Sequence, residues 1–261
     1  MTKNNIVKDI IETGSEITGG VGGAVLGGLI AGPVGVVIGG ASGPILTKMF
    51  KMLGTELKSR LLSQREEIRT GAAYTYSIDK ILENENEGKK LRADDFFKFT
   101  ENERSAAEEV FEGIILKAQK EYEENKIKYY GNLLGNIACD ESIDKVYANQ
   151  LIRLAENLTY NQLCTLKVIN LSRSKKINLR NKNYRNETSE LGRERVTILY
   201  DLIDLENRHL IINSKSNVFG LTDINPSEFE PQGNGNALIQ LMELNKIPNE
   251  HCLNIIQQLS R

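Results

Sequence analysis

Few side chains of this sequence have the types and spacing that catalysis or metal binding requires. The two histidines, His209 and His251, are isolated from any local arrangement of Cys, Asp or Glu that resembles a metal site. The three cysteines, Cys139, Cys164 and Cys252, are far apart and odd in number. That pattern indicates neither a disulfide framework nor a zinc site, and it suits a reducing compartment.

Neighbouring acids are equally weak candidates for acid–base catalysis. They occur at Glu66-Glu67, Asp94-Asp95, Glu108-Glu109 and Glu123-Glu124. Such pairs are typical of exposed helix faces, and the sequence lacks the HExxH, CxxC, GxSxG and P-loop motifs. Glycine strings at residues 20–23 resemble a dinucleotide fingerprint, but no predicted strand precedes them. We therefore predict a protein that is not an enzyme and that binds no cofactor and no metal.

One basic segment has the composition that neutralises phosphate groups. Residues 173–195 are polar, lack a clear period and are predicted to form a loop, and the first half of this loop, residues 173–185, is basic. No acid interrupts the basic residues, which are Arg173, Lys175, Lys176, Arg180, Lys182 and Arg185. This loop is the candidate contact for a nucleic acid or a protein partner.

The elements expected around this loop resemble a winged helix. They are helices at 160–172 and 195–206, strands at 209–212 and 218–222, and a turn at 213–217. In DNA-binding winged helices, the second of the paired helices lies in the major groove. Here that helix carries Asp201, Asp204 and Glu206, which would repel the DNA backbone. A partner-binding or structural role is therefore favoured over DNA binding, and both stay open.

The N-terminal fifth of the chain is dominated by glycine. Between Glu16 and Lys48 the sequence carries no charge, and this stretch holds half of the chain's 22 glycines. Small residues recur at every fourth position, at Gly19, Gly23, Gly27, Ala31, Gly35, Gly39 and Gly43. Positions four apart share one face of a helix, and small-xxx-small faces let helix backbones approach closely, above all in lipid. Glycine weakens a soluble helix by roughly 1 kcal/mol per residue, so helix propensity does not explain this composition.

Two arrangements of the glycine segment remain open. A single kinked span is long enough to cross a bilayer, since about 20 apolar residues suffice. A hairpin turning at Gly32-Pro33 would have arms of roughly 22 Å, shorter than the hydrocarbon core of about 30 Å. The modest aliphatic content and the missing aromatic belt favour conditional insertion over a permanent anchor. A glycine-packed hairpin buried in a soluble helical protein is the alternative.

Outside the glycine segment the sequence is mostly helical in pattern, and the whole chain has 33 basic and 35 acidic residues and a net charge of −2. Apolar periodicity predicts helices at 3–16, 48–90, 103–138, 142–158, 160–172, 195–206, 236–245 and 249–259. Asp140, Ser142 and Thr159 are the expected N-caps of the helices at 142–158 and 160–172. The nearly even charge balance gives no global field for nucleic acid or anionic lipid.

The stretch from Glu108 to Val168 resembles the abortive-infection alpha family of bacterial phage-defence proteins. The residues that carry the resemblance are Tyr130, Asn132, Leu133 and Leu134 in one helix, Leu158, Thr159, Gln162 and Leu163 before the next, and the element Leu205–Ile212. The match covers about a quarter to a third of the chain, and no catalytic residues carry over from the family. The glycine segment is similar instead to the glycine zippers of membrane-active proteins.

These observations together predict a mostly α-helical protein in three parts. Residues 1–50 form an amphipathic helix and the glycine-zipper segment, 51–158 a helical body, and 159–261 a small winged-helix-like α+β module. The resemblances imply a membrane-active defence effector at the cytoplasmic face of the bacterial inner membrane. Its expected partners are membrane lipid, further copies of itself, and a phage-derived or protein trigger. The alternative is a soluble regulator or adaptor whose C-terminal module binds DNA or a protein.

Overall fold

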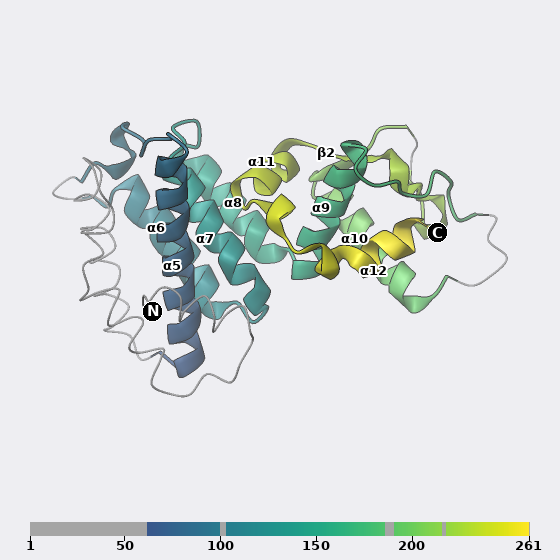
Figure 1. Cartoon of the computed structure of the whole chain (residues 1–261), viewed down its shortest axis with the longest axis horizontal. Helices are drawn as coiled ribbons and strands as arrows, with labels where there is room; N and C mark the ends of the chain where they lie inside the picture. Colours follow the sequence, from purple (N-terminus) through teal and green to yellow (C-terminus); the bar gives the residue numbers. More distant parts are fainter. Residues whose placement is uncertain (1–61, 100–102, 186–190, 216–217, 261) are drawn as a thin grey trace. The chain divides into compact units, whose positions relative to one another are not determined.

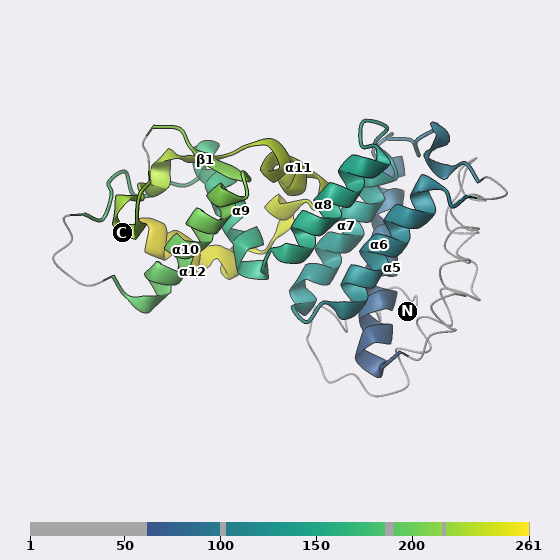
Figure 2. The same cartoon turned by 180° about the vertical axis from the view of Figure 1, so that it is seen from behind.

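The structure of the chain is a computed structural model. It describes residues 62–99, 103–185, 191–215 and 218–260. The predicted helix at 3–16 and the glycine segment lie outside the described residues. The chain divides into two compact units, Met1–Glu156 and Asn157–Arg261 (Figures 1 and 2).

The first unit consists of helices in its described part. These are α5 (Gln64–Asn86), α6 (Ala106–Lys120), α7 (Ile127–Ile137) and α8 (Lys145–Asn157), with 3-10 turns at Asp95–Phe97 and Glu124–Lys126. Two capping boxes fix where helices begin, with Ser63 and Glu66 at α5 and Ser105 and Glu108 at α6. Apolar side chains from all four helices are buried, and the largest fully buried ones include Phe111 and Tyr130.

Helices α5 and α7 pack with an unusually close approach of their backbones. Gly131 and Gly135, four residues apart on α7, both face α5. A Cβ atom at Gly131 would lie 2.4 Å from the Cβ of Tyr76, and one at Gly135 would lie 2.6 Å from the Cβ of Lys80. Real side chains do not come this close, so only glycine permits this packing.

The helix predicted at 103–138 is broken in the structure. α6 ends at Lys120 and α7 begins at Ile127, with Glu121–Lys126 forming the connection. The other helices predicted for this unit agree better with the structure. α5 lies inside the helix predicted at 48–90, of which residues 48–61 lie outside the described residues, and α8 matches the helix predicted at 142–158. Asp144, rather than Asp140 or Ser142, accepts the hydrogen bond from the first turn of α8, from the amide of Tyr147.

The second unit contains four helices and a small sheet among its described residues. The helices are α9 (Tyr160–Arg173), α10 (Arg193–Asn207), α11 (Gly233–Leu241) and α12 (Asn249–Ser260). Short 3-10 turns lie at Leu221–Asp223, Pro226–Glu228 and Leu244–Lys246. Thr159 caps α9 through a capping box with Gln162, which confirms that predicted N-cap. α9 contacts α10, α11 and α12, so it lies at the centre of this unit's core.

The sheet pairs β1 (Ile211–Asn213) with β2 (Phe229–Pro231) in antiparallel register, with Ile212 opposite Glu230. The second strand predicted at 218–222 is therefore wrong, because Leu221–Asp223 forms a 3-10 turn. The true partner lies further along the chain, where Phe229 is buried and Gln232 donates its backbone N–H to the Leu210 carbonyl. The described chain is thus mostly helical, with one small two-stranded sheet.

Candidate functional site

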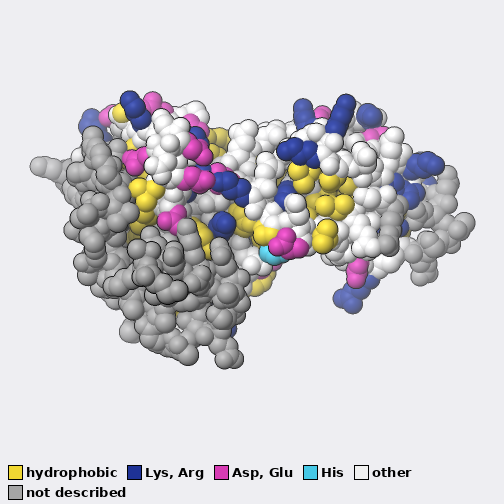
Figure 3. Space-filling view, viewed as in Figure 1, with side chains coloured by type: hydrophobic (Ala, Val, Ile, Leu, Met, Phe, Trp, Pro, Cys, Tyr) yellow, Lys and Arg dark blue, Asp and Glu magenta, His cyan; other side chains and the backbone are white. Residues whose placement is uncertain are grey.

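The first predicted site, the four-spaced face from Gly19 to Gly43, lies outside the described residues. The second, the basic loop, is described for all six of its charged residues. Figure 3 shows lysine and arginine side chains on the surface of the second unit, at the right of the view.

The structure places Arg173 at the end of α9 and the other five basic residues after it, and the three arginines of this segment make contacts within their own unit. Arg173 forms an ion pair with Glu230 at 2.8 Å, and Arg185 forms one with Asp223 at 2.6 Å. The hydrogen bond within the second pair raises the pKa of Arg185 and lowers the pKa of Asp223. Arg180 donates to the carbonyls of Lys182 and Asn183, and its guanidinium lies 4.5 Å from the centre of the Tyr184 ring. These arginines therefore hold the loop in shape.

The three lysines of the loop behave differently. Lys175, Lys176 and Lys182 are exposed, and their side chains form no hydrogen bond or ion pair with the residues that the structure describes. They are the charges that remain available to a phosphate or to an acidic partner. From the sequence, all six charges were candidates for contact with a nucleic acid or a protein partner. In the structure, the three arginines interact within their own unit, and the three lysines remain as candidates.

The acids that seemed to oppose DNA binding are engaged inside the second unit. Asp201 accepts a hydrogen bond from Asn161, and Asp204 accepts one from Gln162 at 2.9 Å. Both donors lie in the first turn of α9, where the positive end of the helix dipole favours negative charge. Burial raises the pKa of Asp201. Asp201 and Asp204 therefore hold α10 against α9.

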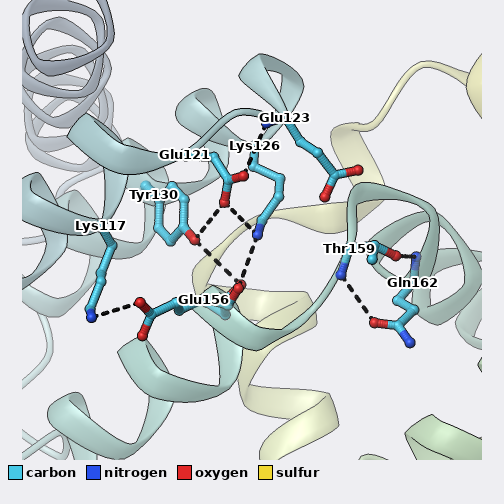
Figure 4. Close-up of polar contacts among 9 residues, drawn as sticks. Lys117, Glu121, Glu123, Lys126, Tyr130, Glu156, Thr159 and Gln162 are labelled. Atoms are coloured by element: carbon cyan, nitrogen blue, oxygen red, sulfur yellow. Dashed lines mark hydrogen bonds and ion pairs between the residues drawn. The ribbon is translucent and has the colours of Figure 1, made fainter. Parts of the chain in front are cut away.

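A buried charged cluster in the first unit was missed by the sequence reasoning (Figure 4). Lys126 and Glu121 are 1% and 8% exposed and form an ion pair at 2.6 Å. The Tyr130 hydroxyl donates to Glu121 at 3.1 Å, and the amide of Glu123 donates to the other oxygen of Glu121 at 3.0 Å. Burial, followed by the charge of Glu121, raises the pKa of Tyr130.

The same cluster closes the C-terminal end of α8. The Lys126 ammonium lies 3.3 Å from the carbonyl of Glu156, and the Tyr130 hydroxyl lies 3.4 Å from the carbonyl of Ala155. The last carbonyls of a helix lack partners within it and carry partial negative charge, so a cation stabilises them. The cluster thus joins the connection between α6 and α7 to the end of α8. Its polar groups are occupied by one another, which is typical of a structural cluster.

The described residues offer no group of three or more His, Cys, Asp and Glu side chains that could hold a metal ion. In the same residues, no helix is both long and apolar enough to cross a membrane. No protein-family model, no curated protein and no solved structure matches this chain.

Proposed function

We propose that this protein is a non-enzymatic, membrane-active effector of bacterial antiphage defence. In this proposal the segment from Gly19 to Gly43 inserts or oligomerises in the inner membrane and dissipates its barrier. The observation that carries the proposal is the uncharged run between Glu16 and Lys48, with small residues at every fourth position. The link to phage defence comes from Glu108–Val168, which resembles the abortive-infection alpha family.

Helix packing elsewhere in the chain supports the physical part of this proposal. Gly131 and Gly135 show what a pair of glycines four residues apart does in this protein. The pair lets helix α5 approach α7 so closely that a side chain at either glycine would clash with α5. The N-terminal segment carries seven small residues in that spacing. In lipid, where apolar surface gives no advantage to association, such close contact is what drives helices together. The helical body would keep the segment masked until a phage-derived or protein trigger releases it.

The experiment places bulky residues on the four-spaced face. Gly23→Leu and Gly35→Leu should abolish the loss of membrane potential in cells that express the protein, because a leucine separates the packed backbones. Val25→Leu and Val37→Leu, which lie off that face, are the matched controls and should act as wild type. Potential is followed with a voltage-sensitive dye, and circular dichroism checks that the helical body still folds. If the glycine variants depolarise cells as fast as wild type, the mechanism is wrong.

A second candidate is a soluble regulator or adaptor, with a winged-helix-like second unit that binds DNA or a protein. The observation that favours it is the set of three exposed lysines that follow α9 in the chain and that pair with none of the described residues. In that case the glycine segment would be buried packing. Fractionation separates the candidates: full-length protein confined to the soluble fraction, without liposome leakage under any trigger, would support the regulator.

A further inference from the structure

Two cysteines that are 88 positions apart in the sequence meet in the core of the second unit. Cys164 lies on α9 and Cys252 on α12, and they are 1% and 0% exposed. Helices α9 and α12 pack against each other, the two thiols perturb each other's pKa, and both are free. The third cysteine, Cys139, belongs to the first unit and interacts with Asn84 instead.

This thiol pair has polar neighbours, which distinguishes it from inert cysteines in an apolar core. The Tyr160 hydroxyl hydrogen-bonds to Cys164 and lies 2.7 Å from Nδ1 of His251, which is exposed. A line of hydrogen bonds therefore runs from the surface to the thiols. The charge of the buried Lys167 ammonium also acts on both thiols, and this ammonium donates to the carbonyl of Ile247 and to the side chain of Asn249.

We propose that Cys164 and Cys252 form a redox-active pair, which hydrogen peroxide converts into a disulfide that joins α9 to α12. The thiolate of Cys252 attacks one peroxide oxygen; the O–O bond breaks, a sulfenic acid forms and water leaves. The sulfur of Cys164 then attacks the sulfenic sulfur, the S–S bond forms and a second water leaves. The two thiols lose two electrons, the peroxide gains them, and the two thiol protons end in water. Tyr160 and His251 supply the path by which protons reach or leave the buried pair.

The roles of the two sulfurs follow from their surroundings. The hydrogen bond from Cys164, together with the charge of Lys167, lowers the pKa of Cys252 despite its burial. The same hydrogen bond, and then burial, raises the pKa of Cys164. Cys252 is therefore the attacking thiolate, since the thiolate is the nucleophile. Because both thiols are buried, the oxidant is a small peroxide rather than a bulky disulfide.

The test uses the full-length protein in its native state with a graded series of hydrogen peroxide. After denaturation, free thiols are counted by maleimide labelling, and tryptic peptides are mapped without reduction. We expect loss of two thiols and a linked pair of peptides, 154–167 with 247–261, that dithiothreitol separates. A disulfide that closes a long loop should also raise the melting temperature by several degrees.

Single variants locate the chemistry. Cys139→Ser should form the same linked peptides, whereas Cys164→Ala and Cys252→Ala should not. Tyr160→Phe keeps the ring and should slow disulfide formation several-fold while reaching the same end state. The proposal is overturned if native wild type keeps all its thiols, or if the product links Cys139 or two separate chains. These readouts follow thiols rather than membrane potential, so they stand independently of the effector proposal.

Discussion

Lys126 is nearly fully buried, and its partner Glu121 is buried with it. Taking two charges out of water is unfavourable, so such a pair persists where each charge has further partners. Lys126 has the Glu156 carbonyl, and Glu121 has the Tyr130 hydroxyl and the Glu123 amide. The pair therefore adds little net stability, but the loss of either member alone should strongly destabilise the fold.

A variant that lacks one member of the pair should therefore be less stable than a variant that lacks both charges. Lys126→Met leaves the carboxylate of Glu121 buried without a counter-ion and should lower the free energy of unfolding by about 3 kcal/mol. Adding Glu121→Gln should recover most of the loss, because the amide carries no charge. Urea denaturation followed by circular dichroism measures both effects.

The matched control is Lys117→Met, because Lys117 and Glu156 form an ion pair whose side chains are 36% and 42% exposed. An exposed pair contributes roughly 0–1 kcal/mol. Equal losses for Lys117→Met and Lys126→Met would contradict the argument that burial decides the effect.

At the scale of the elements, the approach of α5 to α7 is the most sensitive contact. Gly131→Ala improves helix propensity by roughly 1 kcal/mol, yet it forces a Cβ into Tyr76. Overpacking of a tight core generally destabilises by about 1–3 kcal/mol, so we expect a net loss. Gly113→Ala on α6 is the control: its Cβ would meet Ile152 at 3.7 Å, an ordinary contact, and propensity should then stabilise. Thermal unfolding compares the two, and a rise in melting temperature for both would contradict this reading.

The elements that could be predicted from sequence are those with local signals. Thr159 and Gln162 form a capping box that can be read directly, and α9 begins where they predict. The break between α6 and α7 has no such signal, because EYEENK consists largely of good helix formers. It is fixed by Glu121 and Lys126, whose burial against the end of α8 is tertiary.

Contacts between residues that are far apart in the chain could not be predicted from the sequence either. β1 pairs with β2 and not with residues 218–222, although that segment is rich in residues that favour strands. The reason is that Phe229 of β2 is buried in the core, whereas residues 218–222 are not buried. The basic composition of residues 173–185 was visible, but the pairing of Arg173 with Glu230 was not. The meeting of Cys164 and Cys252 depends in the same way on how α9 and α12 pack.

On the scale of the whole molecule, charge weighs against a nucleic-acid function. The net charge is −2, so the chain as a whole does not attract a polyanion. Attraction would have to come from the loop, where Lys175, Lys176 and Lys182 lack partners among the described residues. For a duplex, each neutralised phosphate contributes about −0.9 to the slope of log K against log salt concentration.

Three lysines therefore predict a slope of roughly −3 and an affinity no tighter than non-specific binding, for which Kd is about 10⁻⁴–10⁻⁶ M. Replacing all three lysines by alanine should abolish this binding, whereas Arg173→Ala should leave the slope nearly unchanged because Arg173 is already paired with Glu230. Fluorescence anisotropy with a labelled duplex over a series of salt concentrations measures the slope. Sequence-selective binding in the nanomolar range would instead support the regulator, since three phosphate contacts cannot produce it and base contacts from the second unit would be required.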